Sequence, residues 1–340
     1  MEKSTISVAF VTPLLEGLRR RGFDGDELLD KAGIPPALTA LPHARVSAAS
    51  YATLLRLTAQ VLDDEFFGQD RRRMKVGSFA MLGRILIHCD RLDKALDLAL
   101  RYYALQLDDV YGSLRRDGDL VWLALHPRDA GRPVGVFAQE TMLMFIHRLA
   151  CWLVNRRIAI QRAAFSYAAP PHHGEYDLLF CSGQAFGQPF TGLAMEARSL
   201  TLPVARRADS LRDFLSKAPE NLLFQYKNGD SMTIQILRRL GSMAPADWPS
   251  LEQLARDLRT STSTIRRRLE SEGQYYQGLK DQVRRDMAIN LLNGTGMSVM
   301  DIGAELGFAE TSAFHRAFKK WTGANPGEYR RTLSRATPSS

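Results

Sequence analysis

Residues 250–270 read SLEQLARDLRTSTSTIRRRLE, and residues 298–322 read SVMDIGAELGFAETSAFHRAFKKWT. Each stretch carries apolar or small residues at helical spacing, in two runs separated by a short break. These residues are Leu251, Leu254, Ala255, Leu258, Ile265 and Leu269 in the first stretch, and Val299, Ile302, Gly303, Leu306, Phe314 and Phe318 in the second. The first runs are offset by 48 residues (Leu254 to Ile302) and the second runs by 49 (Arg267 to Arg316). The chain therefore contains two copies of a helix-turn-helix pattern, with one residue added in the second turn.

Both copies begin with a helix-start signal. Ser250 with Gln253 forms a capping-box pattern, and Ser298 opens the second copy in a related way. The second helix of each copy is then predicted at Ser261–Glu270 and at about Glu310–Thr322. Two such helices in one chain can enter successive major-groove segments about 34 Å apart along the duplex. The pattern therefore predicts binding to double-stranded promoter DNA.

The buried stripe of each second helix decides which side chains remain for DNA. With Ile265 and Leu269 inward, the residues that face outward are Ser263, Arg266 and Arg267. With Phe314, Phe318 and Trp321 inward, they are Thr311, Ser312, His315, Arg316 and Lys319. An arginine fork matches O6 and N7 of guanine, and each such contact contributes about 1–3 kcal/mol of discrimination. A long helix at Tyr276–Leu292, with Val283, Met287 and Leu291 as its inward row, is expected to set the spacing between the two copies.

With these motifs, the segment Leu251–Arg331 closely resembles the DNA-binding domain of the AraC/XylS family of bacterial transcription regulators. The matching motifs are Arg266-Arg267-Arg268-Leu269, Glu272-Gly273, Asp301-Ile302-Gly303, Leu306-Gly307-Phe308, Ser312-Ala313-Phe314, Arg316-Ala317-Phe318, Gly323-Ala324-Asn325-Pro326 and Tyr329-Arg330. The resemblance implies two helix-turn-helix units joined by one long helix. It also implies base contacts from Ser263, Arg266 and Arg267 in the first helix and from Thr311, Ser312 and Arg316 in the second.

Two residues depart from the family pattern. Arg259 stands in the first turn, where this family often has Gly, and an irregular turn is expected there. Gly303 stands where Ala is usual, which costs about 1 kcal/mol of helix stability unless packing requires a glycine.

The first two hundred residues predict an α+β domain with helices first and a small, mostly antiparallel sheet afterwards. Helices are expected at Val8–Arg21, Gly25–Gly33, Ser47–Leu62, Asp93–Leu107, Phe137–Val154 and His172–Phe180. Strands are expected at Leu107–Leu114, Leu120–His126, Gln161–Tyr167 and Met195–Leu202. From Asp230 onward every expected element is a helix, so the second domain is all-α.

These first two hundred residues resemble a ligand-sensing domain, called arabinose-binding-like, from one branch of the same family. The matching stretches are Leu28–Pro35 and Gly77–Gly83 followed by Leu92–Leu96. The resemblance implies a small-molecule effector of unknown identity, bound at residues that the sequence does not assign. It also implies a homodimer and contact with RNA polymerase, and by analogy transcriptional activation.

These inferences divide the chain into four parts. Residues 1–205 are expected to sense an effector and dimerise, 206–229 to link, 230–333 to bind DNA, and 334–340 to form a flexible tail. The fragment Asp230–Ser340 is expected to fold and bind DNA alone. A length of 340 residues fits two domains.

Charge and composition limit the class of protein. The net charge of +8 suits a polyanionic partner without selecting one. Cys89, Cys151 and Cys181 are far apart and are expected to be reduced. No signal-peptide layout and no apolar run of about 18 residues occurs, so a cytoplasmic protein is expected, with no membrane partner. No motif for a cofactor is found.

Two alternatives remain. Residues 1–205 could serve only for dimerisation or protein interaction, without a ligand, or they could carry an enzyme. His172 and His173 with Glu175 suggest a metal, but no second ligand pair follows, and a surface helix start is the better interpretation. Ser182 lacks the surroundings of a hydrolase nucleophile. The sequence therefore predicts no catalytic residue and no metal site.

Overall fold

The computed structural model describes residues 5–41, 44–181, 183–223, 232–271 and 274–334. Contacts group the chain into two compact units. The terminal unit comprises Met1–Thr12, Asp26–Tyr51 and Gly229–Ser340, and the central unit comprises Pro13–Gly25 and Ala52–Asn228. This grouping is not linear along the chain, so it differs from the four-part division above, which remains a prediction about folding and function. Ser182, the motif Glu272-Gly273 and most of the predicted tail lie outside the described residues.

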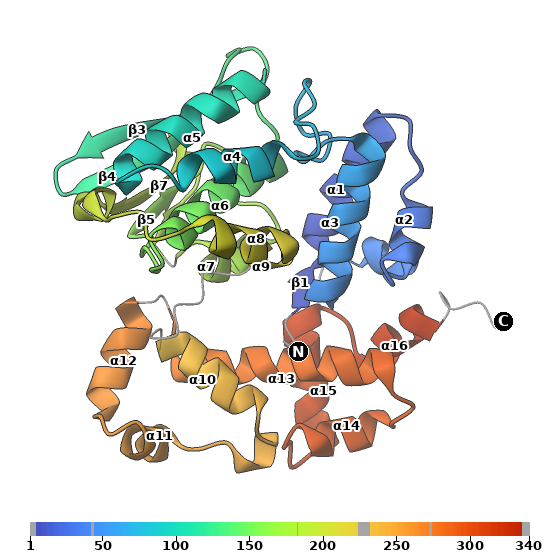
Figure 1. The fold of residues 1–340 in the computed structure, drawn as a ribbon. Coiled ribbons are helices and arrows are strands. Elements are labelled where there is room, and N and C mark those ends of the chain that lie inside the picture. Colours follow the sequence, from blue (N-terminus) through green and yellow to red (C-terminus); the bar gives the residue numbers. More distant parts are fainter. Residues whose placement is uncertain (1–4, 42–43, 182, 224–231, 272–273, 335–340) are drawn as a thin grey trace. The chain divides into compact units, whose positions relative to one another are not determined.

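The central unit is built on a five-stranded sheet with the order β3-β4-β7-β5-β6. Its strands are β3 (Val110–Asp117), β4 (Leu120–Pro127), β5 (Arg162–Ala164), β6 (Gln184–Ala185) and β7 (Thr191–Glu196). Neighbouring strands are antiparallel except β5 and β6, which are parallel. Helix α5 (Leu92–Gln106) packs on β3, and α6 (Val136–Leu153) packs on β4 and β7 (Figure 1). The predicted α+β class is confirmed.

The remaining helices of this unit are short. They are α4 (Ser78–Leu86), α7 (Tyr176–Leu179), α8 (Ala208–Ser216), α9 (Glu220–Leu223) and the 3₁₀ helices η3 (His173–Glu175) and η4 (Ala197–Thr201). Helices α1 (Val11–Arg20) and α3 (Ala48–Leu62) each have residues in both units. None of the described helices is both long and apolar enough to cross a membrane.

Four elements predicted in the central unit differ from the observed bounds by three residues or more. The strand expected at Leu107–Leu114 is β3, which lies three residues later, and the strand expected at Gln161–Tyr167 is β5, which ends at Ala164. The strand expected at Met195–Leu202 is β7, which ends at Glu196 and is followed by η4. β7 lies between β4 and β5, and its first five residues are all buried, so it lacks the alternation that marks a half-exposed strand. The helix expected at His172–Phe180 is only the short pair η3 and α7. Gly174 in its first turn weakens a continuous α-helix there.

The terminal unit joins residues from the start of the chain to the helices of its last third. The early elements are β1 (Thr5–Ser7), η1 (Val8–Phe10), α2 (Asp26–Lys31), η2 (Pro36–Ala40) and β2 (Arg45–Ser47). The late elements are α10 (Met232–Gly241), η5 (Pro245–Asp247), α11 (Leu251–Asp257), α12 (Thr262–Ser271), α13 (Tyr276–Gly294), α14 (Val299–Glu305), α15 (Thr311–Thr322) and α16 (Pro326–Ser334). β1 and β2 pair antiparallel, and η2 contacts α16.

Buried polar contacts connect the early and late elements of this unit. Thr5 Oγ1 donates to Asp286 Oδ1 on α13 at 2.6 Å, and Arg45 Nε donates to Thr5 Oγ1 at 2.8 Å. The Tyr329 hydroxyl on α16 donates to the backbone oxygen of Arg45 at 2.7 Å and accepts from its backbone nitrogen at 3.2 Å. All four residues are buried. We call this group the N-terminal clasp. Burial raises the pKa of Asp286, and the nearby positive charges of Arg285 and Arg45 oppose that rise.

Candidate nucleic-acid interface

The first helix-turn-helix consists of α11 and α12. Ser250 Oγ accepts from the backbone nitrogen of Gln253 at 3.2 Å, and Gln253 Oε1 accepts from that of Ser250 at 2.7 Å, so the predicted capping box is present. Leu254, Ile265 and Leu269 are at most 1% exposed, because they fill the space between the two helices. The predicted inward face of α12 is therefore confirmed.

The second helix-turn-helix consists of α14 and α15. Ser298 Oγ accepts from the backbone nitrogen of Asp301 at 3.1 Å and donates to its carboxylate at 2.6 Å. Phe314 and Phe318 are fully buried, as predicted, whereas Trp321 is only partly buried. An aromatic core, extended by Phe308 with its ring 5.5 Å from that of Phe314, replaces the aliphatic core of the first copy.

The two turns begin in the same way, although the second (306–310) is one residue longer than the first (258–261), as the sequence predicted. Arg259 has φ +50° and Gly307 has φ +74°, both in the left-handed region. In the first copy the backbone nitrogens of Arg259 and Thr260 donate to carbonyl oxygens of the first helix at 3.1 and 2.9 Å. In the second copy those of Gly307 and Phe308 donate to the equivalent carbonyls at 2.9 and 3.0 Å. The irregular first turn expected from Arg259 is therefore wrong. What remains is the strain of a side chain at positive φ.

Packing explains the second departure from the family pattern. A Cβ atom at Gly303 would lie 3.3 Å from Cδ1 of Phe314 and 3.4 Å from its Cβ. The aromatic ring thus occupies space that a methyl group needs, and the smaller residue lets α14 approach α15.

The structure exposes most of the residues predicted to contact DNA. Ser263, Arg266 and Arg267 are exposed on α12, and their spacing of three and four residues puts them on one face. On α15, Ser312 and Arg316 are exposed and Thr311 is half-buried. The three arginines form no ion pair with any residue in the described ranges. Their guanidinium groups are free to meet phosphates or base edges.

Both predicted serines have partners within the protein. The Ser263 hydroxyl lies 2.8 Å from that of Ser261, and Ser312 Oγ donates to Glu310 Oε2 at 3.0 Å. Glu310 is exposed at the start of α15, where the sequence analysis treated it only as a helix boundary. A carboxylate in the major groove accepts from N4 of cytosine. Glu310 stands directly before Thr311 and Ser312 in the sequence, and this position was the available signal for a further candidate DNA contact.

Arg284 contacts both helix-turn-helix units, and the sequence motifs did not indicate this role. It lies on α13, and its guanidinium carbon is 5.0 Å from the ring centroid of Trp248 and 5.5 Å from that of Phe308. Its Nε donates to the backbone oxygen of Leu306 at 3.1 Å. Trp248 precedes α11 and Phe308 follows α14, so this one side chain contacts both units. Burial lowers the pKa of Arg284.

The long helix α13 was predicted at nearly its observed bounds, but only part of its predicted inward row is right. Met287 is buried, whereas Val283 and Leu291 are half-buried. An arginine repeating at helical spacing with Tyr276 and Lys280 was the available signal for Arg284, because such a row marks a second contact face.

His172, which the sequence offered as a possible metal ligand, has partners within the protein. His172 Nε2 lies 2.9 Å from Oε1 of buried Glu140, and the Tyr176 hydroxyl also donates to this carboxylate. Within the described ranges, no three or more His, Cys, Asp or Glu side chains are arranged to hold a metal ion. His172 therefore acts in the packing of this unit.

Comparisons with known proteins cover nearly the whole chain. Residues 22–204 match the family model described as the arabinose-binding domain of AraC transcription regulators, N-terminal, and residues 254–332 match a helix-turn-helix domain model. The ornithine utilization regulator of Pseudomonas aeruginosa is 32% identical over an alignment of 339 positions, and this alignment covers 96% of this chain and 96% of the relative.

Other matches are more distant or more local. The urease operon transcriptional activator of Escherichia coli is 32% identical over 108 residues, 32% of this chain and 36% of the relative. The solved structure of the transcriptional regulator CdpR from Pseudomonas aeruginosa has a TM-score of 0.31 and 20% identity, over 90% of this chain and 96% of that one. The relatives described here are named as transcription regulators and not as enzymes.

Proposed function

This chain belongs to the AraC family of DNA-binding transcription regulators, and we propose that it recognises its promoter through α12 and α15. The proposed base-contacting residues are Ser263, Arg266, Arg267, Thr311, Ser312 and Arg316. The observation that supports this proposal is the set of exposed arginines without ion pairs among the described residues, on the second helix of each helix-turn-helix unit. A helix N-terminus presents free amides to the DNA backbone, which positions such side chains over base edges.

The experiment begins by mapping genomic binding sites by immunoprecipitation to define the operator. Arg267→Ala and Arg316→Ala are then tested on operators mutated at single base pairs. Each variant should lose about 1–3 kcal/mol of discrimination at one base pair, in a different half of the operator. Lys320→Ala is the control on α15. Lys320 is exposed, and losing a lysine that contacts phosphate should lower the affinity for every DNA sequence equally. Uniform weakening by the arginine variants as well would reassign them to the backbone.

We further propose that the central unit controls this binding through a small-molecule effector. Membership in a family model named for arabinose binding supports a sensing role without specifying a sugar. The relative named for ornithine utilization makes amino acids and their derivatives the first compounds to screen. An effector shifts the equilibrium between two states of the regulator only by its differential affinity for them. Thermal shifts absent across a broad metabolite panel would favour the alternative, a dimerisation or protein-interaction module.

Activation, contact with RNA polymerase and a homodimer complete the proposal. The relative named as a transcriptional activator supports the proposed activation. In vitro transcription from the mapped promoter, with and without the protein, tests activation, and sedimentation of the full chain tests the dimer. Repression of the same promoter would reverse the proposed sign of regulation.

A further inference from the structure

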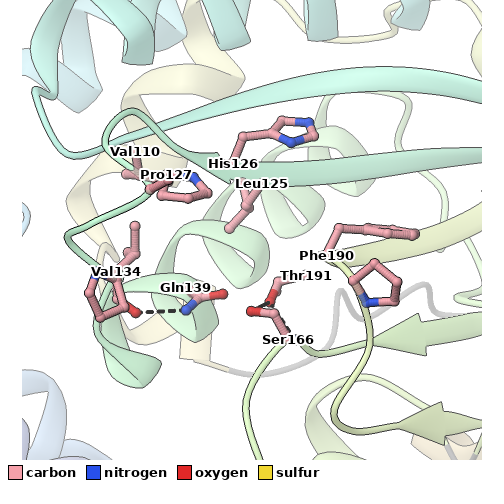
Figure 2. A pocket seen from close by; sticks show the side chains of 12 residues that line it. Val110, Leu125, His126, Pro127, Val134, Gln139, Ser166, Phe190 and Thr191 are labelled. Carbon is pink, nitrogen blue, oxygen red and sulfur yellow. Dashed lines mark hydrogen bonds between the residues drawn. The ribbon is translucent and has the colours of Figure 1, made fainter.

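A cavity of about 200 Å³ opens in the central unit, between the sheet and the start of α6. Its apolar wall includes Leu125 on β4, Val134 before α6 and Phe190 before β7. Figure 2 shows three polar side chains, Gln139, Ser166 and Thr191, facing one another across this space. An apolar pocket with a few convergent polar groups is the usual form of a small-molecule site.

Gln139 contributes an unused acceptor. Its Nε2 donates to the backbone oxygen of Val134 at 2.7 Å, which orients Oε1 into the cavity (Figure 2). The residue is only 8% exposed, yet Oε1 accepts no hydrogen bond from any residue in the described ranges. Because Oε1 faces the cavity and is not used within the described part of the protein, it can accept a hydrogen bond from a ligand.

Ser166 and Thr191 contribute a donor. Thr191 Oγ1 accepts from the backbone nitrogen of Ser166 at 3.0 Å, and the two hydroxyl oxygens lie 3.0 Å apart. Whichever hydroxyl donates to the other, the pair retains one hydroxyl hydrogen. The cavity thus offers one acceptor and one donor on facing walls, a pattern complementary to a group that both donates and accepts.

The cavity lining carries no Asp, Glu, Lys or Arg among the residues that form it. Arg115 lies over the Phe190 ring, 5.2 Å from its centroid, and is not part of the lining. His126 Nε2 lies 2.7 Å from Ser113 Oγ. Burial and, to a smaller extent, the positive charge of Arg115 lower the pKa of His126, so its imidazole is neutral near pH 7. An ionic ligand would lose hydration here without gaining a counter-charge.

We propose that this cavity binds a small neutral amide, such as a lactam. The amide N–H donates to Gln139 Oε1, the amide oxygen accepts from the Ser166–Thr191 hydroxyl pair, and the hydrocarbon part packs on Leu125, Val134 and Phe190. This inference rests on the proposed effector-sensing role and specifies the ligand class for it.

The test uses the full chain and three matched probes in ligand-observed NMR titrations. δ-Valerolactam carries both hydrogen-bonding groups, N-methyl-δ-valerolactam lacks the donor, and 5-aminovalerate is the ring-opened zwitterion. We expect the methylated lactam and 5-aminovalerate to bind at least 10-fold more weakly than the parent lactam. Equal or tighter binding of 5-aminovalerate, or no binding of the lactam, would overturn the assignment.

Variants place the binding in the cavity. Gln139→Leu and Ser166→Ala should each weaken lactam binding at least 10-fold, and Gln60→Leu, at an exposed position on α3, should leave it unchanged. Circular dichroism checks that each variant is folded, and the second cavity variant remains informative if the first is not. Lactam binding unaffected by both would also overturn the proposal. Operator binding is measured separately, so a failed cavity assignment leaves the proposed DNA recognition intact.

Discussion

Each of the two helix-turn-helix units has a left-handed residue at the start of its turn, but the two units differ in what supports them. In the first, α12 packs on α10, and Trp248 Nε1 donates to the backbone oxygen of Leu240 at 2.9 Å, so support comes from the preceding helix. In the second, Phe318 of α15 packs against Tyr329 with ring centroids 5.4 Å apart, and Tyr329 bonds to the backbone of Arg45. A repeated sequence therefore does not imply repeated support. The second unit depends on residues from the start of the chain.

This difference predicts that the two helix-turn-helix units respond differently to an effector bound in the central unit. The early elements that hold Tyr329 and Asp286 continue directly into α1 and α3, whose later residues belong to the central unit. We expect a change in those helices to affect α15 more than α12, because the clasp bonds the early elements to α13 and α16 and no comparable bond to α12 occurs among the described residues. The predictions below test this asymmetry.

The largest effect is expected from removing the N-terminal clasp. The fragment Asp230–Ser340 removes Thr5 and Arg45 from Asp286 and Tyr329, and losing these hydrogen bonds and this cover costs roughly 3–5 kcal/mol in total. We therefore expect α15 and α16 to lose hydrogen-exchange protection in this fragment, and to regain it when residues 1–51 are fused to its start. The independent folding expected from the sequence stays a prediction, which this experiment tests.

Helix α12 is the internal control for this experiment, because its support lies within the fragment. Tyr329→Phe in the full chain gives a milder version, since it removes both hydrogen bonds and keeps the ring. Protection lost equally from α12 and α15 would show that the two units do not differ in support.

The next effect concerns the connection between the units. Arg284→Met removes the hydrogen bond to Leu306 and the planar group between Trp248 and Phe308. We expect affinity for an operator with both half-sites to fall about 10-fold, or about 1.4 kcal/mol, because the recognition helices lose their fixed spacing. Binding to an operator with one scrambled half-site should change little.

Lys280→Met is the matched control for Arg284→Met. Lys280 lies one turn earlier on α13 and donates to the backbone oxygen of Pro249 at 2.9 Å, so its contact is with the first unit. If it lowers full-operator affinity as much as Arg284→Met, the effect belongs to α13 in general and not to the connection.

The sequence predicted the local features of both units and missed what joins them. Caps, recognition-helix bounds and the buried faces follow from patterns within about twenty residues, and these were right for Ser250, Ile265 and Phe314. Arg284 was missed because its partners, Trp248 and Phe308, come from segments 36 and 24 residues away. The clasp was missed for the same reason: Tyr329 meets Arg45 across 284 residues, and no periodicity reports such a contact.

A smaller, pH-dependent effect is expected at Asp286. Its pKa is raised in the folded state, mainly by burial, so its protonated form favours folding and this contribution is lost as pH rises through the folded-state pKa. Asp286→Asn does not titrate. The stability of the variant relative to the wild-type chain should therefore improve from pH 4 to pH 7, as measured by urea unfolding. A difference that stays constant, or that moves in the opposite direction, would contradict the raised pKa.

The smallest effect separates the two turns themselves. Arg259 holds a side chain at φ +50°, which costs about 1 kcal/mol relative to glycine, so Arg259→Gly should stabilise the first unit by up to that amount. Gly307→Ala should destabilise the second by a similar amount, because a Cβ atom there meets only ordinary contacts, the nearest at 3.5 Å, and strain comes from φ +74° alone. Thermal unfolding of the two variants gives opposite shifts on this account. If Arg259→Gly instead leaves stability unchanged and weakens binding to every DNA sequence, the arginine is retained in its strained conformation as a phosphate contact.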